Sequence, residues 1–306
     1  MCKTISTMGM EHEEWLRLRK GGIGGSDAGA VCGLNLYRSP MAVYWEKTTD
    51  TLDLSDNEAM RQGRDLENYV AQRFTEETGK KVRRSNKMYW SEEHPFMYAD
   101  VDRLLVGEDA GLECKTVSAY NAGKWENGAI PMQCIHYMVV TGKRTWYIAA
   151  VILGQGFVYS RIDWDEEMGE QLIALEEDFW ENHILARRMP EPDGSASCSA
   201  VLEEYFHRFK KTETRELSAA METKLNRRQD ISEKMKQLER EKTQIEQEVK
   251  VFMDGCGEAN SEHYRVVWQE IASECLDIKR LKQEKPEVYR EYVQSRKSSR
   301  FTVKVA

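Results

Sequence analysis

The sequence lacks the long apolar runs of a membrane protein. No run approaches the roughly 18 consecutive apolar residues that suggest a transmembrane helix. The N-terminal residues also lack the apolar core of a secretory signal peptide. We therefore expect a cytoplasmic protein with no membrane partner.

The cysteines are scattered, and none of the seven lies in a Cys-x-x-Cys spacing. This pattern argues against a zinc ribbon and against a framework of disulfides. The spacing gives no support to an iron–sulfur site either. A reducing cytoplasm is the simplest environment for such a chain.

Positive charge is not in excess, since 44 Lys and Arg stand against 52 Asp and Glu for a net charge of −8. Proteins that coat nucleic acid passively are usually basic overall, so this class is disfavoured. An enzyme that acts on nucleic acid stays open. Clustered active-site carboxylates add negative charge, and a local basic groove can still steer DNA.

The order of the expected elements predicts an α/β protein with an extension. Residues 1–187 contain helices, then strands, a crossing helix, two more strands and a helix, which indicates a mixed sheet flanked by helices. Residues 188–200 are rich in Pro, Gly and small side chains and predict a linker. Residues 201–306 predict a helical arm followed by a small C-terminal α/β element.

The arm carries a coiled-coil-like pattern. Between residues 216 and 253, apolar side chains recur at spacings close to three and four between Glu- and Lys-rich faces. Arg228 and Lys242 occupy gaps in this stripe. We expect a helix that packs against a partner helix, and we expect residues 263–271 to pair as a strand with residues 300–305.

The stretch Tyr98–Thr116 predicts two short strands joined by a polar, glycine-containing turn. Asp102 lies in the first strand, opposite Glu113 in the second, and Lys115 shares the face of Glu113. Asp100 is expected to point to the opposite face. Unpaired charges are costly in a core, but two carboxylates and an ammonium suit a divalent metal beside a phosphate. The alternative is a solvated hairpin with a cross-strand charge pair.

A glycine-rich segment, residues 21–27, runs into a helix that Ser26 or Asp27 could cap. Such a loop before a helix is a ready anion site, and Arg19 could reach the same phosphate as a fork donor. The G-x-G-x-x-G spacing of a dinucleotide site is absent. The alternative is a flexible linker with an ordinary helix cap.

Two helices supply further candidate side chains. Glu67 lies beside the apolar stripe of a helix expected over residues 57–79, where it is either a surface ion-pair partner or a metal ligand. Gln133 and Tyr137 lie four residues apart on a helix that begins near Pro131 and therefore share a face. They either line a site or mark an ordinary amphipathic boundary.

Taken together, these motifs resemble the YqaJ-type viral recombinases, a lambda-exonuclease-like branch of the PD-(D/E)XK nucleases. The resemblance covers roughly residues 10 to 185. Its five motifs, in order, are the N-terminal signature of Leu18–Leu34 with Ser39-Pro and Trp45-Glu-Lys, then Gly63–Glu67, Ala99–Asp102, Leu112–Thr116 and Gln133–Tyr137. It implies a restriction-endonuclease-like core.

The resemblance also implies a metal site. Asp102 and Glu113 would be the metal-binding acids, and Glu67 would complete the shell. The backbone carbonyl of Cys114 would be a further ligand, although an aliphatic residue is usual at this position. Lys115 would position the attacking water or help to deprotonate it. Carboxylate oxygens without His or Cys clusters favour Mg²⁺, with Mn²⁺ as a substitute, over zinc.

The remaining motif residues receive roles in the same way. Gln133 and Tyr137 match a Q-x-x-x-Y element that would steady the site. Arg19 and Ser26 match the positions that hold a 5′-terminal phosphate. Val101 departs from the pattern, because proline stands there in the motif's name.

The resemblance implies a 5′→3′ exonuclease of phage or prophage origin that acts in the bacterial cytoplasm. It would degrade one strand of linear double-stranded DNA to 5′-mononucleotides and leave a 3′ overhang for a single-strand annealing protein. Some family members form homotrimers. Two alternatives stay open, namely an endonuclease of the same fold and a non-catalytic DNA-end-binding scaffold. The charged site residues favour the enzyme, and the Arg19–Ser26 pocket favours action at ends.

Overall fold

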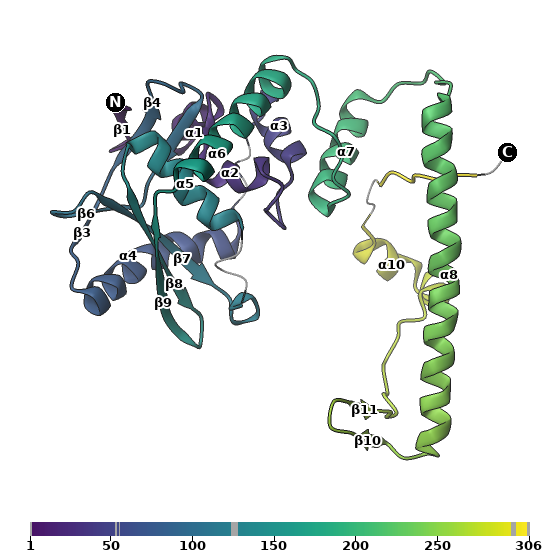
Figure 1. Cartoon of the computed structure of the whole chain (residues 1–306). Helices are drawn as coiled ribbons and strands as arrows, with labels where there is room; N and C mark the ends of the chain where they lie inside the picture. Colours follow the sequence, from purple (N-terminus) through teal and green to yellow (C-terminus); the bar gives the residue numbers. More distant parts are fainter. Residues whose placement is uncertain (1, 53, 55, 124–127, 295–297, 305–306) are drawn as a thin grey trace. The chain divides into compact units, whose positions relative to one another are not determined.

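The computed structural model describes the whole chain except residues 1, 53, 55, 124–127, 295–297 and 305–306 (Figure 1). The chain divides into two compact units, Met1–Phe209 and Lys210–Ala306. This boundary lies beyond the linker that the sequence predicts at 188–200.

Helix α7 (Ala196–Phe209) explains why the boundary lies later. Its residues Cys198 and Val201 are buried in one cluster with Met41 and Val43 of helix α3 (Pro40–Thr48). The small residues that look like a linker in the sequence therefore include the first turn of a helix that packs on the first unit.

The first unit is built on a five-stranded mixed sheet with the order β3-β6-β7-β8-β9. Its strands are β3 (Val82–Arg84), β6 (Arg103–Leu105), β7 (Ala110–Val117), β8 (Thr145–Ile152) and β9 (Gly156–Asp163). Within this sheet β7 and β8 run parallel and the other neighbouring strands run antiparallel. Helix α5 (Ala129–Thr141) forms the crossover that a parallel pair requires. The α/β fold with a mixed sheet flanked by helices is confirmed.

Helices cover both faces of this sheet (Figure 1). Helix α4 (Glu58–Thr78) packs Val70 and Phe74 into a cluster with Leu112 and Tyr147. Helices α5 and α6 (Glu166–Phe179) pack with Trp146 and Ile148, which alternate with the α4-facing residues along β8. Strand β8 is therefore buried on both sides, which accounts for its almost continuous apolar sequence.

A second, four-stranded sheet has the order β1-β4-β5-β2. It contains β1 (Cys2–Ser6), β4 (Lys87–Ser91), β5 (Met97–Asp100) and β2 (Ile23–Gly24), and helices α1 (His12–Lys20) and α2 (Gly25–Val31) flank β2 in the sequence. The chain leaves β5 and enters β6 of the larger sheet through Val101 and Asp102 alone. The two sheets are thus joined at Asp102.

A buried ion pair ties α5 to α6. The His136 Nδ1 atom lies 2.9 Å from both carboxylate oxygens of Glu176, and its Nε2 atom donates to the carbonyl of Tyr98 at 2.8 Å. Burial opposes the charge, but Glu176 outweighs it and raises the pKa of His136 above its ordinary value. When it is protonated, the ring donates from both nitrogens and so links two helices to strand β5.

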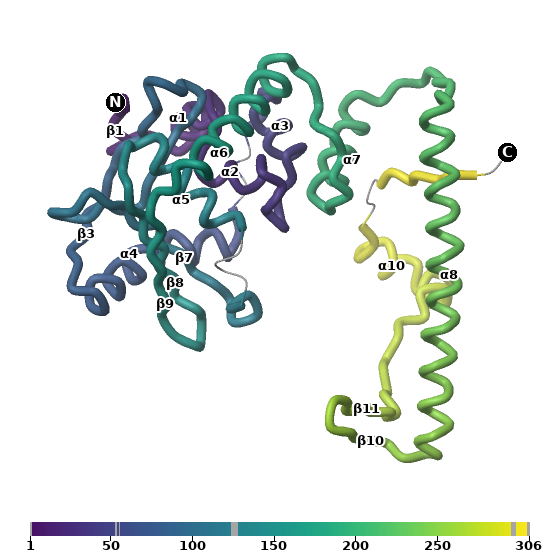
Figure 2. The backbone as a smooth tube through the Cα atoms, viewed as in Figure 1, coloured from purple at the N-terminus to yellow at the C-terminus, as the bar shows by residue number. Residues whose placement is uncertain are grey.

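The second unit contains helix α8 (Ala219–Met253), which runs unbroken for 35 residues (Figure 2). After it come β10 (Glu258–Asn260), β11 (Arg265–Val267), α9 (Ile278–Glu284) and α10 (Pro286–Tyr292). The helical extension is confirmed. The predicted pairing of 263–271 with 300–305 is wrong, because β11 pairs with β10 and the described residues 300–304 form no strand.

Among the helices of the described residues, none has the length and apolarity to cross a membrane.

Gly111 on β7 is expected to accept no side chain. A Cβ atom there would lie 2.3 Å from the ring of the fully buried Trp146. We expect Gly111→Ala to lower the free energy of unfolding by about 1–3 kcal/mol, as in other overpacked cores, measured by denaturant unfolding. Gly63→Ala in α4 is the matched control, because nothing lies within 4 Å of a Cβ there. It should stabilise the helix slightly. An unchanged stability of Gly111→Ala would contradict this packing.

Candidate active site

A cavity of about 200 Å³ lies beside Asp102, where the two sheets are joined. It is lined by Trp15, Arg19, Gly24, Gly25, Ser26, Met88, Tyr98, Asp100, Asp102, Glu113, Gln133 and Tyr137. Six of the predicted site residues are therefore brought together. They come from helix α1, the glycine-rich segment that opens α2, the inter-sheet connection, β7 and α5.

Two carboxylates face one another across the hairpin of β6 and β7. The ladder ends where Arg103 pairs with Leu112, and continuing this register puts Asp102 opposite Glu113, just beyond the last paired position. Asp102 lies in a bend before β6 and not within a strand. Its Oδ2 atom accepts a 2.8 Å hydrogen bond from the Cys114 N–H group. Burial and then the charge of Glu113 raise the pKa of Asp102 well above its usual range.

Glu113 belongs to a chain of polar contacts that spans β7 and α5. Its Oε1 atom lies 2.6 Å from Lys115 Nζ and 2.9 Å from Gln133 Nε2. The Gln133 oxygen accepts a 3.0 Å hydrogen bond from Lys115, and its Nε2 atom lies 2.7 Å from the Tyr137 hydroxyl. Burial opposes the Lys115 charge, but Glu113 outweighs it and raises the pKa of Lys115. Lys115 is therefore a charged hydrogen-bond donor in this arrangement.

The donor set fits a hard divalent cation. Glu113 Oε2 is buried and has no hydrogen-bond partner in the part of the chain that the structure describes, and Asp102 lies directly opposite. Mg²⁺ is commonly held by one or two carboxylates together with waters and substrate phosphates. No group of three metal-ligating His, Cys, Asp or Glu side chains occurs among the described residues. A closed zinc site, which needs about four such ligands, is therefore a poor fit.

Glu67 is placed differently from the two central acids. Its carboxylate pairs with the buried guanidinium of Arg103 and lies 3.8 Å from Arg84. It does not line the cavity, although its charge contributes to the raised pKa of Asp102. Arg103, a residue that the sequence did not single out, also donates to the Asp102 carbonyl at 2.8 Å. The metal-ligand role of Glu67 stays a prediction, as does that of the Cys114 carbonyl.

Asp100 does not point away from the site. It lines the same cavity as Asp102, and its Oδ2 atom accepts a 2.8 Å hydrogen bond from Trp15 Nε1. Residues two apart in extended chain share a face, so the strand period itself favours this placement. Burial raises the pKa of Asp100, and the charge of Glu113 adds to the shift. A third carboxylate therefore stands at the rim.

The predicted phosphate-binding residues are in direct contact. Arg19 Nη2 donates to the Ser26 hydroxyl at 2.8 Å, and the guanidinium lies 4.8 Å from the centre of the Trp15 ring. Ser26 lies in the first turn of α2, whose N-cap position is Gly24, and the Asp27 side chain completes a capping box with the Gly24 N–H group. A Cβ atom on Gly25 would lie 2.4 Å from the Tyr137 ring. Only glycine therefore lets this segment approach α5.

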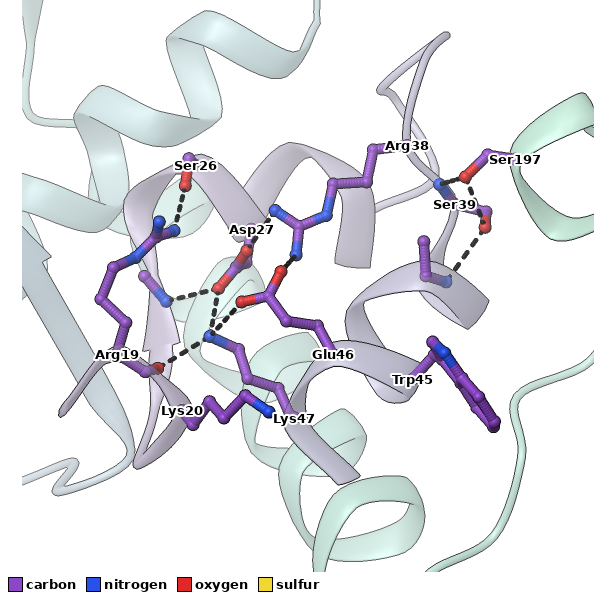
Figure 3. Close-up of polar contacts among 12 residues, drawn as sticks. Arg19, Lys20, Ser26, Asp27, Arg38, Ser39, Trp45, Glu46, Lys47 and Ser197 are labelled. Atoms are coloured by element: carbon purple, nitrogen blue, oxygen red, sulfur yellow. Dashed lines mark hydrogen bonds and ion pairs between the residues drawn. The ribbon is translucent and has the colours of Figure 1, made fainter. Parts of the chain in front are cut away.

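Behind Ser26 lies a buried charge network that the sequence analysis missed (Figure 3). Asp27 is fully buried and lies 2.8 Å from Arg38 and 2.9 Å from Lys47. It also accepts a 3.0 Å hydrogen bond from the Gly24 N–H group. Burial opposes its charge, but Lys47 and Arg38 lower the pKa of Asp27 below its ordinary value.

Lys47 connects this network to the candidate phosphate pocket. Its side chain is fully buried, and its Nζ atom donates to the Arg19 carbonyl at 2.8 Å (Figure 3). Since Asp27 fixes Gly24 and Lys47 fixes Arg19, the network holds the backbone on both sides of the Arg19–Ser26 pair. The Trp45-Glu-Lys segment was the available sequence signal.

Comparisons with known proteins place the chain in a family. The family model described as YqaJ-like viral recombinase domain matches residues 14–144. A protein of Bacillus subtilis (strain 168), named "Uncharacterized protein YqaJ", is 34% identical over 302 residues, which are 96% of this chain and 95% of that protein. The chain belongs to the YqaJ-like viral recombinase family. The stretch that matches the YqaJ-like model contains every candidate site residue, and the alignment with the Bacillus subtilis protein extends into the helical arm.

Two solved structures are similar to part of this YqaJ-like chain. LHK-Exo in complex with dAMP, an alkaline exonuclease from Laribacter hongkongensis, is 21% identical with a TM-score of 0.48, over 57% of this chain and 94% of that chain. A phage-related exonuclease from Haemophilus somnus 129PT is 11% identical with a TM-score of 0.42, over 56% of this chain and 99% of that chain.

Lys47 is expected to be a stability determinant. Removing one partner of a buried ion pair leaves the other charge uncompensated, so Lys47→Met should lower the free energy of unfolding by about 3–5 kcal/mol. Lys20→Met is the matched control, because the Lys20 ammonium donates to the carbonyls of Thr49 and Thr51, has no ion pair among the described residues and is partly exposed. Denaturant midpoints give the comparison. Equal losses in the two variants would show that the network does not stabilise the fold.

Proposed function

We propose that this protein is a metal-dependent 5′→3′ exonuclease that degrades one strand of linear double-stranded DNA. The products would be 5′-mononucleotides and a 3′ overhang, which a single-strand annealing protein could use. The observation that carries the proposal is one cavity that contains both the Asp102–Glu113 carboxylate pair and the Arg19–Ser26 pair. Membership of the viral recombinase family supports it.

The carboxylates would hold the cation. Asp102 and Glu113 would bind Mg²⁺ or Mn²⁺, and Glu67 and the Cys114 carbonyl are further candidate ligands. The cation would polarise the scissile phosphate and lower the pKa of the attacking water. The Cys114 N–H group and Gln133 fix the orientation of the two central carboxylates before any ligand arrives. Because the carboxylates are already oriented, they need not reorient during the reaction.

Lys115 would contact the reacting phosphate, and its neighbours Gln133 and Tyr137 would hold it in place. The ammonium would donate to oxygens of the reacting phosphate and stabilise the negative charge that develops there. Gln133 holds the Lys115 side chain at 3.0 Å, and Tyr137 lies against the amide of Gln133 at 2.7 Å. These contacts support positioning roles for Gln133 and Tyr137.

Arg19 and Ser26 favour action at a DNA end. An internal phosphodiester passes through a site, whereas a terminal 5′-phosphate carries additional negative charge that a guanidinium and a hydroxyl can bind. Their position in the same cavity as the carboxylates would fix the distance between the strand end and the scissile bond. An endonuclease has no need of such a pocket.

Replacement of Lys115 tests catalysis. We expect Lys115→Met to lower the rate of digestion of end-labelled linear duplex by about 10²–10³-fold, as for loss of one charge-stabilising donor. Lys143→Met should cleave normally, because Lys143 is paired with Asp109, whereas Lys115 contacts Glu113 and Gln133. Chelation of the metal should abolish cleavage, and Mg²⁺ or Mn²⁺ should restore it. Tight end binding by folded wild type without any cleavage would identify a scaffold instead.

The terminal pocket has its own test. Wild type should prefer 5′-phosphorylated to 5′-hydroxyl ends, and Arg19→Gln should reduce that preference by about 10- to 100-fold, the value of a lost charged hydrogen bond. Ser26→Ala should act in the same direction, more weakly. Arg17→Gln on the same helix is the control, because Arg17 pairs with Glu13 and does not line the cavity. Equal cutting of closed circular and linear DNA would identify an endonuclease.

A further inference from the structure

Helix α8 carries an apolar stripe that the second unit leaves uncovered. Ile231, Met235, Leu238, Ile245 and Phe252 are between 44% and 82% exposed. Scattered exposed apolar side chains are ordinary. Here they recur in a heptad pattern through most of a 35-residue helix, which is the signature of a coiled coil.

The heptad register follows from the spacing. The first core position, a, falls on Met221, Arg228, Met235, Lys242 and Val249, and the second, d, falls on Lys224, Ile231, Leu238, Ile245 and Phe252. The flanking g position falls on Arg227, Lys234, Glu241 and Glu248. Basic g residues thus lie in the N-terminal half of α8 and acidic g residues in the C-terminal half.

A parallel pair of such helices would be strongly disfavoured. In a parallel dimer each a residue meets the same residue of its partner. Arg228 would face Arg228 of a second copy, and Lys242 would face Lys242. Glu241 at g would also meet Glu246 at the following e position. Like charges would therefore meet at three levels of one seam.

An antiparallel pair removes each of these conflicts. With Met235 placed opposite Leu238 of a second copy, Arg228 meets Ile245 and Lys242 meets Ile231. Long basic side chains can lay their methylene stems over such apolar residues while the charge reaches water. The Lys242 ammonium already extends towards the flanking e positions, since it lies 3.3 Å from Glu239 and 3.9 Å from Glu246.

The flanking charges match the same alignment. In an antiparallel pair the g positions face one another, so Lys234 meets Glu241 of the second copy and Arg227 meets Glu248. The twofold axis repeats both contacts and yields four complementary pairs. Among the described residues, Arg227, Lys234 and Glu241 form no ion pair within the chain. These groups are available to a partner.

We propose that α8 binds α8 of a second copy of this chain as an antiparallel two-stranded coiled coil, with Met235 opposite Leu238. The surface would serve self-association of the arm. It does not depend on the nuclease activity proposed for the first unit.

Cross-linking of the full chain tests the orientation. The alignment brings Met221 next to Phe252 of the second copy, whereas a parallel pair would separate them by the length of about 31 residues, roughly 46 Å. We would oxidise an equal mixture of Met221→Cys and Phe252→Cys variants, each with the exposed Cys256 and Cys275 changed to Ser. Peptide mapping should find a bond between positions 221 and 252. Bonds of 221 to 221, or no intermolecular bond at α8, would overturn the proposal.

Charge exchange tests the register. Glu241→Lys with Glu248→Lys should weaken self-association by about tenfold or more, and Arg227→Glu with Lys234→Glu should do the same, because each places like charges at all four contacts. A mixture of the two variants should recover the wild-type affinity in sedimentation equilibrium. Asp230→Lys with Glu233→Lys, outside the seam, is the matched control and should leave affinity unchanged. Failure of the mixture to recover would overturn the pairing.

Discussion

The first unit depends on negative charge that is concentrated where its two sheets meet. Asp102 and Glu113 lie opposite one another in a largely buried place, and Glu113 retains an oxygen without a hydrogen-bond partner among the described residues. A fold tolerates such crowding at a cost in stability. Lys115 and Gln133 offset part of it by bonding one oxygen of Glu113 and leaving the other oriented for a ligand. One Glu113 oxygen is thus satisfied within the protein, and the other faces the place of the cation proposed for this site.

Local sequence rules predicted much of this arrangement. Periodicity located α4, α5 and the hairpin of β6 and β7, and the period of two in a strand put Glu113 and Lys115 on one face. The helix spacing brought Gln133 to Tyr137. Each of these relations involves residues close in the sequence or directly paired across a hairpin, where geometry leaves little freedom.

Relations between distant segments could not be predicted in the same way. The pairing of Glu67 with Arg103, the contact of Trp15 with Asp100 and the burial of Lys47 depend on how helices dock on the sheets. From the sequence, a lysine at the next-to-last position of a helix is expected on the surface, because nothing local indicates that its partner Asp27 is buried. The packing of α7 on α3 also explains why the first unit extends to Phe209, beyond the linker predicted at residues 188–200.

The helical arm illustrates the same limit of prediction from local sequence. The spacing of apolar residues predicted that this helix has a partner helix. Whether the two helices run parallel or antiparallel depends on the order of charges at the g positions. That order can be assigned because α8 is one unbroken helix. An antiparallel seam has twofold symmetry. If the first unit forms the homotrimer that the resemblance implies, threefold and twofold contacts together generate either a closed assembly of six chains or an open network.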